Sequence, residues 1–287
     1  MENLADATVF ITGGAQGIGL GLARAFARAG ARIALADVDR DQLRVAEQEL
    51  SALGEVSAYA LDVRDRDAFA RVADTVEERH GPVTVLCNNA GVAAAVPPSS
   101  LTYELWDHVL GINLGGTVNG LQTFLPRMLH RGGPAQIVNI ASGAGLVASD
   151  KILYVASKFA VVGLSEALRQ HRELGECGIG VTVVCPGFVH TGVMANSAKL
   201  DPGGGLPAHD ARDALFERFG LPADVVGEQV VRAVRENRLY VPTDRMLAGP
   251  IEQRTQALLE AMPPETERDR QIAAVFEQTI KSAILSG

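Results

Sequence analysis

The alternation of short apolar runs with longer helical stretches constrains the fold of this chain more than any other feature. The runs are rich in β-branched residues and predict strands, whereas the stretches between them have the length and composition of helices. Strand, helix and strand repeated in this way predict a parallel sheet, and nearly continuous apolar strands predict helices on both of its faces. The predicted strands cover residues 7–12, 32–37, 56–61, 83–88, 136–141, 180–185 and 239–241. The predicted helices cover residues 19–29, 40–53, 66–79, 103–130, 154–174 and 223–237.

Two stretches depart from this alternation. His190–Gly220 contains SAKLDPGGGLPAHD, which is rich in Gly and Pro and has no clear period, so we predict a mobile loop and interpret it as a substrate lid. Beyond the last strand, patches at 250–261 and 265–284 predict helices that pack on the body or on a partner subunit. We therefore predict one α/β domain at 1–242, with its substrate loop at about 190–220, and a helical C-terminal extension at 243–287.

Charge and composition narrow the classes of partner. The net charge of −8 and the pI near 5.3 disfavour nucleic acid and anionic membranes, so we expect a small-molecule substrate. No segment approaches the roughly 20 apolar residues of a membrane span, and the first residues lack a basic start, which predicts a soluble cytoplasmic protein. Three cysteines without CxxC spacing predict plain thiols, and six histidines without HExxH predict no metal site.

A glycine-rich turn, TGGAQGIG, directly follows the first predicted strand and opens a helix. Gly13, Gly17 and Gly19 allow a sharp turn, close approach of a pyrophosphate and tight packing of the helix, whose free N–H groups face the anion. The spacing is GxxxGxG rather than GxGxxG, and glycines at a helix start can also serve packing alone. Their place after the first strand of an alternating chain favours dinucleotide binding.

Asp37 ends the second predicted strand, 18 residues after Gly19. An acid at this place can bind both hydroxyls of an adenosine ribose and would repel a 2′-phosphate, which favours NAD over NADP. Gln16 and Val38 are uncharged, whereas Arg40 is a nearby cation that keeps NADP open as an alternative. Taken alone, Asp37 could equally be a turn former or a helix cap.

Two further strand ends carry polar or small residues. Asp62 and Val63 follow the third strand, where a carboxylate and a backbone N–H can bind the edge of an adenine. The NNAG segment at 88–91 ends the fourth strand, where small residues can lie under a ribose. Their placement at the carboxyl ends of neighbouring strands predicts contact with a cofactor that crosses this edge of the sheet.

Ser142, Tyr154 and Lys158 form the set with the clearest chemistry. Tyr154 and Lys158 are four residues apart, so in a helix they share one face, and an ammonium beside a phenol lowers the pKa of the phenol. A tyrosine in that position can accept a proton from an alcohol.

Over about residues 5–242 the chain resembles the short-chain dehydrogenases/reductases of the roughly 250-residue type. The resemblance rests on motifs that occur in the order of that family, namely TGGAQGIG, Asp62, NNAG, Asn113, Ser142, YVASK and PGFVHT. The resemblance implies a single-domain Rossmann fold with a doubly wound, seven-stranded parallel sheet and a homodimer or homotetramer. It implies that Tyr154 is the acid/base, that Lys158 holds the nicotinamide ribose and lowers the pKa of Tyr154, and that Ser142 orients the substrate oxygen. Asn113 would anchor a water in a proton relay.

The resemblance also implies that Thr191 and the backbone near Val189 contact the nicotinamide carboxamide. Two departures concern the substrate side: Cys185 stands where the family often has Asn, and the separation of Ser142 from Tyr154 is one residue shorter than the commonest one. The predicted cofactor contacts are Gly13, Gln16, Gly17, Ile18, Gly19, Asp37, Asp62, Val63, Asn89, Ala90, Gly91, Tyr154, Lys158, Pro186, Gly187, Val189 and Thr191.

We therefore expect an NAD(H)-dependent oxidoreductase that acts on a secondary alcohol or its ketone. The segments GGTVNGLQTFLPRMLHRG and RENRLYVPTDR are similar to bacterial dehydrogenases that oxidise the benzylic alcohol of lignin-type aryl ethers. The alternatives are a non-enzymatic dinucleotide sensor, which would not need the Tyr and Lys, and a nucleotide-sugar epimerase or dehydratase, which has a larger C-terminal domain. A methyltransferase would have no use for YVASK.

Overall fold

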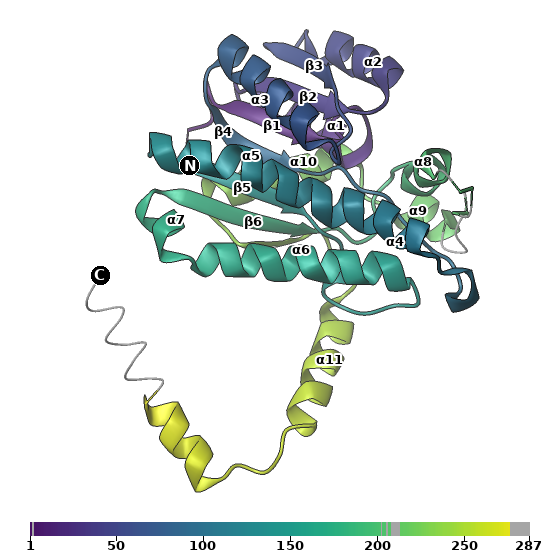
Figure 1. Ribbon diagram of the computed structural model, residues 1–287, viewed down its shortest axis with the longest axis vertical. Helices are drawn as coiled ribbons and strands as arrows, with labels where there is room; N and C mark the ends of the chain where they lie inside the picture. The colour runs from purple at the N-terminus through teal and green to yellow at the C-terminus, as the bar shows by residue number, and fades with distance from the viewer. Residues whose placement is uncertain (2, 202, 205, 208–212, 276–287) are drawn as a thin grey trace. The chain divides into compact units, whose positions relative to one another are not determined.

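The protein is built on a seven-stranded sheet in which all neighbouring strands are parallel (Figure 1). The computed structural model describes residues 1, 3–201, 203–204, 206–207 and 213–275. The strand order is β3-β2-β1-β4-β5-β6-β7, which confirms the predicted Rossmann fold. The strands are β1 (Thr8–Thr12), β2 (Arg32–Asp37), β3 (Val56–Ala60), β4 (Val83–Asn88), β5 (Ala135–Ile140), β6 (Ile179–Cys185) and β7 (Tyr240–Pro242).

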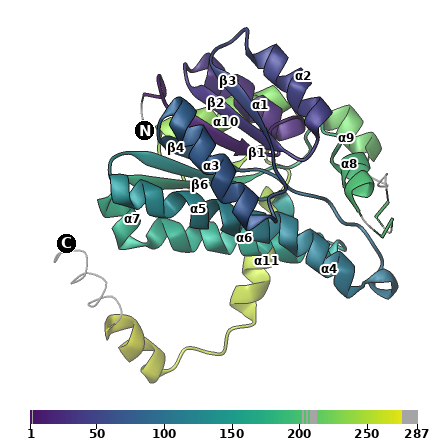
Figure 2. The ribbon, with the colours of Figure 1, turned by 45° about the horizontal axis from the view of Figure 1, so that its top comes forward.

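Helices cover both faces of this sheet (Figures 1 and 2). One face carries α1 (Gly17–Arg28), α2 (Arg40–Leu50) and α10 (Ala223–Arg235). The other carries α3 (Arg66–His80), α5 (Gly116–Arg131) and α6 (Ile152–Gln170). The other described helices before α11 are η1 (Pro98–Ser100), α4 (Tyr103–Leu110), η2 (Gly111–Gly115), η3 (Gly143–Gly145), α7 (Arg172–Glu176), α8 (Val193–Leu200) and α9 (Asp213–Phe219).

The period-two geometry of a strand explains why both faces are apolar. In β1, Val9 and Ile11 belong to the core under α1, α2 and α10, whereas Phe10 points to the opposite face. The Phe10 ring lies 5.8 Å from Phe69 and 4.9 Å from Phe124, measured between ring centroids. All five residues of β1 are buried, so its three central residues are apolar and only the threonines at its two ends are polar.

Two predicted helices and one predicted loop differ from the structure. The predicted helix at 103–130 is interrupted by the π-helical turn η2, and the one at 154–174 ends at Gln170, before a break at His171 and the short α7. The prediction of an irregular loop at 190–220 is wrong for α8 and α9, because these segments are helical. Most of the Gly and Pro residues of this stretch lie between the two helices, at 202–207, and burial of Met194 and Ser197 stabilises α8 through tertiary contacts.

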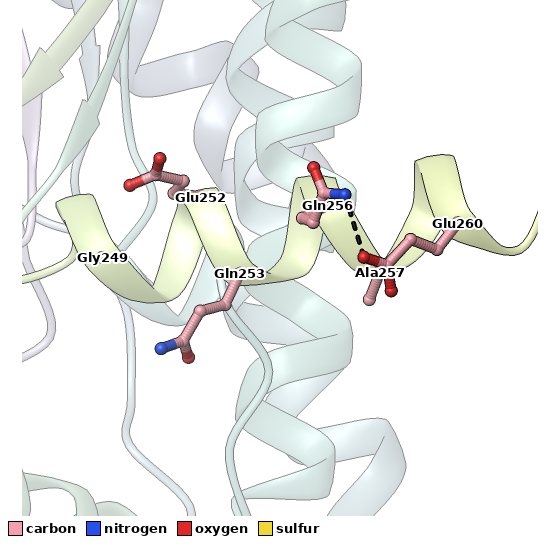
Figure 3. A pocket seen from close by; sticks show the side chains of 6 residues that line it. All are labelled: Gly249, Glu252, Gln253, Gln256, Ala257 and Glu260. Atoms are coloured by element: carbon pink, nitrogen blue, oxygen red, sulfur yellow. Dashed lines mark hydrogen bonds between the residues drawn. The ribbon is translucent and has the colours of Figure 1, made fainter.

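The chain forms two compact units, Met1–Leu247 and Ala248–Gly287. The second contains α11 (Ala248–Glu260), none of whose residues is buried, and a further helical segment at 267–275. A shallow hollow along one side of α11 is lined by this helix alone (Figure 3). Much of the predicted helix at 265–284 lies outside the described residues. Within the described part of the chain, no helix combines the length and the apolar character that a bilayer crossing needs.

Candidate active site

The candidate site lies at the carboxyl edge of the sheet, where all seven strands end. The chain turns there into the glycine-rich segment after β1, the NNAG segment after β4, Ser142 after β5 and Pro186 after β6. Because β1 has β2 on one side and β4 on the other, the chain reverses its direction of winding at this point, which is where open α/β sheets bind ligands.

Ser142, Tyr154 and Lys158 come together at this edge. Tyr154 and Lys158 lie on one face of α6, and the Lys158 Nζ is 5.7 Å from the centroid of the Tyr154 ring. The Ser142 hydroxyl hydrogen-bonds the Tyr154 side chain and accepts a bond of 3.1 Å from the Ala144 N–H. The Lys158 Nζ is buried and donates to the Ile140 carbonyl at 3.0 Å.

The electrostatics of this set differ from the expectation that Lys158 lowers the pKa of Tyr154. Burial raises the pKa of the Tyr154 phenol, and the Ser142 hydrogen bond is the interaction that opposes this effect. Burial also lowers the pKa of the Lys158 ammonium to about 8. The prediction rested on the charge of the lysine alone. Both side chains also lose solvent on burial, which disfavours the charged form of each.

Asn113 is placed by the π-helical turn η2, a deviation that is common at functional sites. Its side chain is buried, accepts from the Val92 N–H at 2.8 Å, and donates to the Val92 carbonyl and the Ser157 hydroxyl at 3.0 Å each. A Cβ added at Gly91 would lie 3.2 Å from the Asn113 Oδ1 and 3.3 Å from the Lys158 Nζ. Gly91 therefore lets Asn113 and Lys158 approach the same point.

The glycine turn packs against the NNAG segment. A Cβ at Gly13 would lie 2.8 Å from the Ala90 Cα, and one at Gly19 would lie 2.0 Å from the Gly13 carbonyl oxygen. Asn89 Nδ2 donates to the carbonyls of Thr12 and Gly13 at 2.9 and 2.8 Å. Since Gly13 and Gly17 also have φ of +60° and +53°, the turn requires glycine for its backbone and for space. Ile18 is half-buried against the core beside it.

The start of α1 is suited to an anion. Gln16 is the N-cap residue, yet its side chain makes no capping bond, so the first N–H groups of α1 have no side-chain acceptor from this residue. The buried Asp37 carboxylate accepts from the Ala15 N–H at 3.1 Å, which joins the end of β2 to the glycine turn. Burial raises the pKa of Asp37, while the N–H bonds from Asp39 and Ala15 oppose that rise. Arg40 is exposed.

Asp62 and Val63 follow β3 on the side of the site where adenine was predicted. The Asp62 carboxylate pairs with the Arg64 guanidinium at 2.6 Å, which lowers the pKa of Asp62. Val63 is buried, and its carbonyl accepts from Asn119 Nδ2 at 2.8 Å. Arg64 was absent from the sequence prediction, and it shares the acceptor capacity of Asp62 with any ligand.

The segment after β6 closes the other side of the site. The Pro186 carbonyl accepts from the Gly143 N–H at 2.8 Å, and the Gly187 N–H donates to the Thr243 hydroxyl at 3.0 Å. Val189 is buried and forms a bridge with Leu221. The Thr191 Cγ2 would lie 3.3 Å from a Cβ at Gly17, so this segment returns to the glycine turn.

Sequence reasoning missed several residues that hold these segments. Ser157 links Asn113 to the Tyr154 carbonyl, and its place directly before Lys158 was the available signal. Asn196 Nδ2 donates to Gln16 Oε1 at 2.9 Å, and the Ser197 hydroxyl accepts from the Ala93 N–H at 2.8 Å. No sequence pattern marks these two contacts, because each joins residues more than 100 positions apart.

Comparison with known proteins agrees with this geometry. The family model of the short chain dehydrogenases matches residues 7–201. A C alpha-dehydrogenase of Sphingobium sp. is 36% identical over 275 residues, covering 92% of this chain and 89% of that protein. The structure of a short-chain dehydrogenase of Novosphingobium aromaticivorans aligns with a TM-score of 0.84 and 34% identity, covering 100% of this chain and 98% of that one.

A short-chain dehydrogenase/reductase of Burkholderia phymatum, solved in complex with NAD, also aligns with a TM-score of 0.84. Its identity is 30%, and the alignment covers 93% of this chain and 99% of that chain. The fold, the order of the motifs and these likenesses confirm the resemblance seen in the sequence. The chain belongs to the short-chain dehydrogenase/reductase family and is an oxidoreductase of alcohols and ketones.

Proposed function

We propose that this protein transfers a hydride between a secondary alcohol, or its ketone, and NAD(H), with Tyr154 as the acid/base. The main observation that supports the proposal is that Ser142, Tyr154 and Lys158 lie close together at the carboxyl edge of the sheet, beside the glycine turn. A phenol hydrogen-bonded to a serine and close to an ammonium can exchange a proton with a substrate oxygen.

The residues present fit a dinucleotide. Gly13 and Gly19 let the turn fold tightly, because a Cβ at either position would clash with backbone atoms of the chain, and α1 begins beside the turn without a side-chain cap from Gln16. Asp37, buried at the end of β2, suits the ribose hydroxyls of NAD and disfavours a 2′-phosphate. When bound, the nicotinamide supplies a carbon that accepts or returns the hydride.

The chain's own groups manage the proton and the developing charge. In alcohol oxidation the Tyr154 phenolate accepts the hydroxyl proton, and in ketone reduction the neutral phenol donates it. The Ser142 hydroxyl stabilises the substrate oxygen as its charge changes. We assign Lys158 to orienting the ribose, and the hydrogen bond from Ser142 is the interaction that favours the phenolate of Tyr154. Asn113 holds η2 in place through Val92 and Ser157, and its part in a proton relay stays a prediction.

For the substrate we propose an aromatic or other hydrophobic secondary alcohol. The relative from Sphingobium is named for dehydrogenation at a Cα position, which supports testing benzylic alcohols first. Residues 1–242 as the catalytic domain, a homodimer or homotetramer, and a cytoplasmic location stay predictions.

Turnover tests this proposal directly. Purified protein is mixed with NAD or NADP and a panel of benzylic, aliphatic and polyol secondary alcohols, and the absorbance of the reduced cofactor is followed. We expect turnover with NAD to exceed that with NADP and benzylic alcohols to react fastest. Preference for NADP would overturn the role of Asp37, and preference for polyols would overturn the substrate class.

A Tyr154→Phe variant tests the assignment of the acid/base. Phenylalanine preserves the ring but cannot exchange a proton, so we expect NADH binding close to wild type and a loss of turnover of about 10²-fold or more. NADH titration and steady-state kinetics measure the two effects separately. Wild-type turnover would contradict the role of Tyr154. A protein that binds NADH but oxidises no alcohol in the panel would instead favour the sensor.

A further inference from the structure

The helix α8 is attached to the two walls of the candidate cofactor site. On one side, the Asn196 Nδ2 donates to the Gln16 Oε1 at 2.9 Å, and Gln16 lies in the glycine turn. On the other side, the buried Ser197 hydroxyl accepts from the Ala93 N–H at 2.8 Å, in the segment that follows NNAG. Figures 1 and 2 both place α8 beside α9, in the segment interpreted from the sequence as the lid.

The contact with Gln16 is placed where a pyrophosphate would be held. Gln16 is the N-cap residue of α1, yet its amide makes no bond to the first N–H groups of that helix. Its oxygen accepts instead from Asn196, so the amide is held toward α8. A side chain without that partner could turn toward the same N–H groups that an anion would use.

A side chain shortly before α8 adds a second contact to the same turn. Thr191 lies against Gly17, and its Cγ2 would be 3.3 Å from a Cβ at that glycine. Asn196 is one helical turn further along, and its N–H donates to the Gly192 carbonyl at 2.9 Å. Displacement of the glycine turn therefore moves the residues that position α8, and displacement of α8 frees Gln16.

We infer that Asn196 is a positioning residue that couples docking of α8 to cofactor affinity through Gln16. This inference rests on the proposed function, since it assumes that the glycine turn binds the pyrophosphate of NAD(H). Coupling between two equilibria is reciprocal, so a cofactor that binds more tightly when α8 is docked must also favour the docked helix.

The test uses NADH as the ligand and two measurements that do not depend on turnover. NADH affinity is measured by fluorescence titration, and docking of α8 by hydrogen exchange of residues 193–200 with and without NADH. In Asn196→Ala, we expect NADH to bind about two- to tenfold more weakly, the range for loss of one hydrogen bond. We also expect NADH to lose most of its protective effect on α8 exchange.

Three further variants make the test specific. In the Asn196→Ala background, Gln16→Ala should weaken NADH binding little further, because the pair acts as one unit. Exchange of the two side chains in Gln16→Asn/Asn196→Gln keeps the combined length and should restore part of the affinity. Ser197→Ala removes the other attachment of α8 but retains the pair, so NADH should still protect α8 from exchange.

The outcomes separate this inference from the proposed function. Additive effects of the two alanine substitutions, or wild-type NADH affinity together with wild-type protection in Asn196→Ala, would overturn the inference alone. Failure of the wild-type protein to bind NADH would overturn the proposed function. Thermal unfolding of each variant confirms that the half-buried Asn196 can be replaced without loss of the fold.

Discussion

At Tyr154, burial and hydrogen bonding act on the phenol in opposite directions. Burial raises its pKa, and the Ser142 hydroxyl lowers it. A phenol that stays protonated at neutral pH is suited to donate a proton in ketone reduction, whereas alcohol oxidation requires the phenolate. The oxidation rate should therefore rise as the pH increases above neutrality.

Ser142→Ala tests this balance at the scale of one residue. Loss of the hydroxyl removes the interaction that lowers the pKa of Tyr154, so the pKa rises further. The rising limb of kcat/KM for alcohol oxidation should then move to higher pH, in addition to a loss of rate of roughly 10²-fold from the missing hydrogen bond to the substrate. Profiles of kcat/KM against pH for both reaction directions measure the shift. An unchanged position of the limb would contradict the electrostatic role of Ser142.

At the scale of elements, α1 and α10 cross so closely that their backbones touch. A Cβ at Gly21 would lie 2.3 Å from the Ala223 carbonyl oxygen, and one at Gly227 would lie 2.2 Å from the Gly21 carbonyl oxygen. The neighbouring atoms belong to the backbone and cannot rotate away, so only glycine fits at these two positions. This contact fixes the helix that opens with the glycine turn.

Gly227→Ala should therefore destabilise the protein by about 1–3 kcal/mol, because an extra methyl group forces the two helices apart. Gly163→Ala is the matched control, since Gly163 is exposed in α6 and a Cβ there meets nothing within 4 Å. The control should stabilise the protein by about 0.5–1 kcal/mol through its higher helix propensity. Urea unfolding of both variants measures the difference, and equal effects would contradict the packing argument.

At the scale of the whole molecule, the buried core belongs to Met1–Leu247. All buried apolar residues in the described part of the chain lie in this unit, and α11 has none. The stretch between β7 and α11 contacts the candidate site, since Thr243 accepts from the Gly187 N–H and Leu247 lies against Gly143. The boundary of the folded unit thus lies a few residues beyond the last strand.

Two truncations test this boundary. A chain that ends at Leu247 should unfold cooperatively with a Tm within a few degrees of the full chain, because it retains every buried apolar side chain in the described residues. A chain that ends at Pro242 loses Thr243 and Leu247 and should melt at a clearly lower temperature. Thermal unfolding followed by circular dichroism compares the two, and a large loss of stability in the longer chain would contradict this division.

The sequence alone was sufficient for the order of strands and helices, the parallel sheet and the family, because these depend on local period and on motifs such as TGGAQGIG and YVASK. The sequence also predicted that Ser142, Tyr154 and Lys158 lie at one edge of the sheet, since parallel strands end on the same side.

Only the tertiary structure decided the pKa directions of Tyr154 and Lys158, because desolvation depends on what surrounds a side chain in space. The same holds for helical structure within 190–220 and for the contact of Asn196 with Gln16. Burial of Met194 and a hydrogen bond across 180 residues have no local signature, since both arise only after distant segments have packed together.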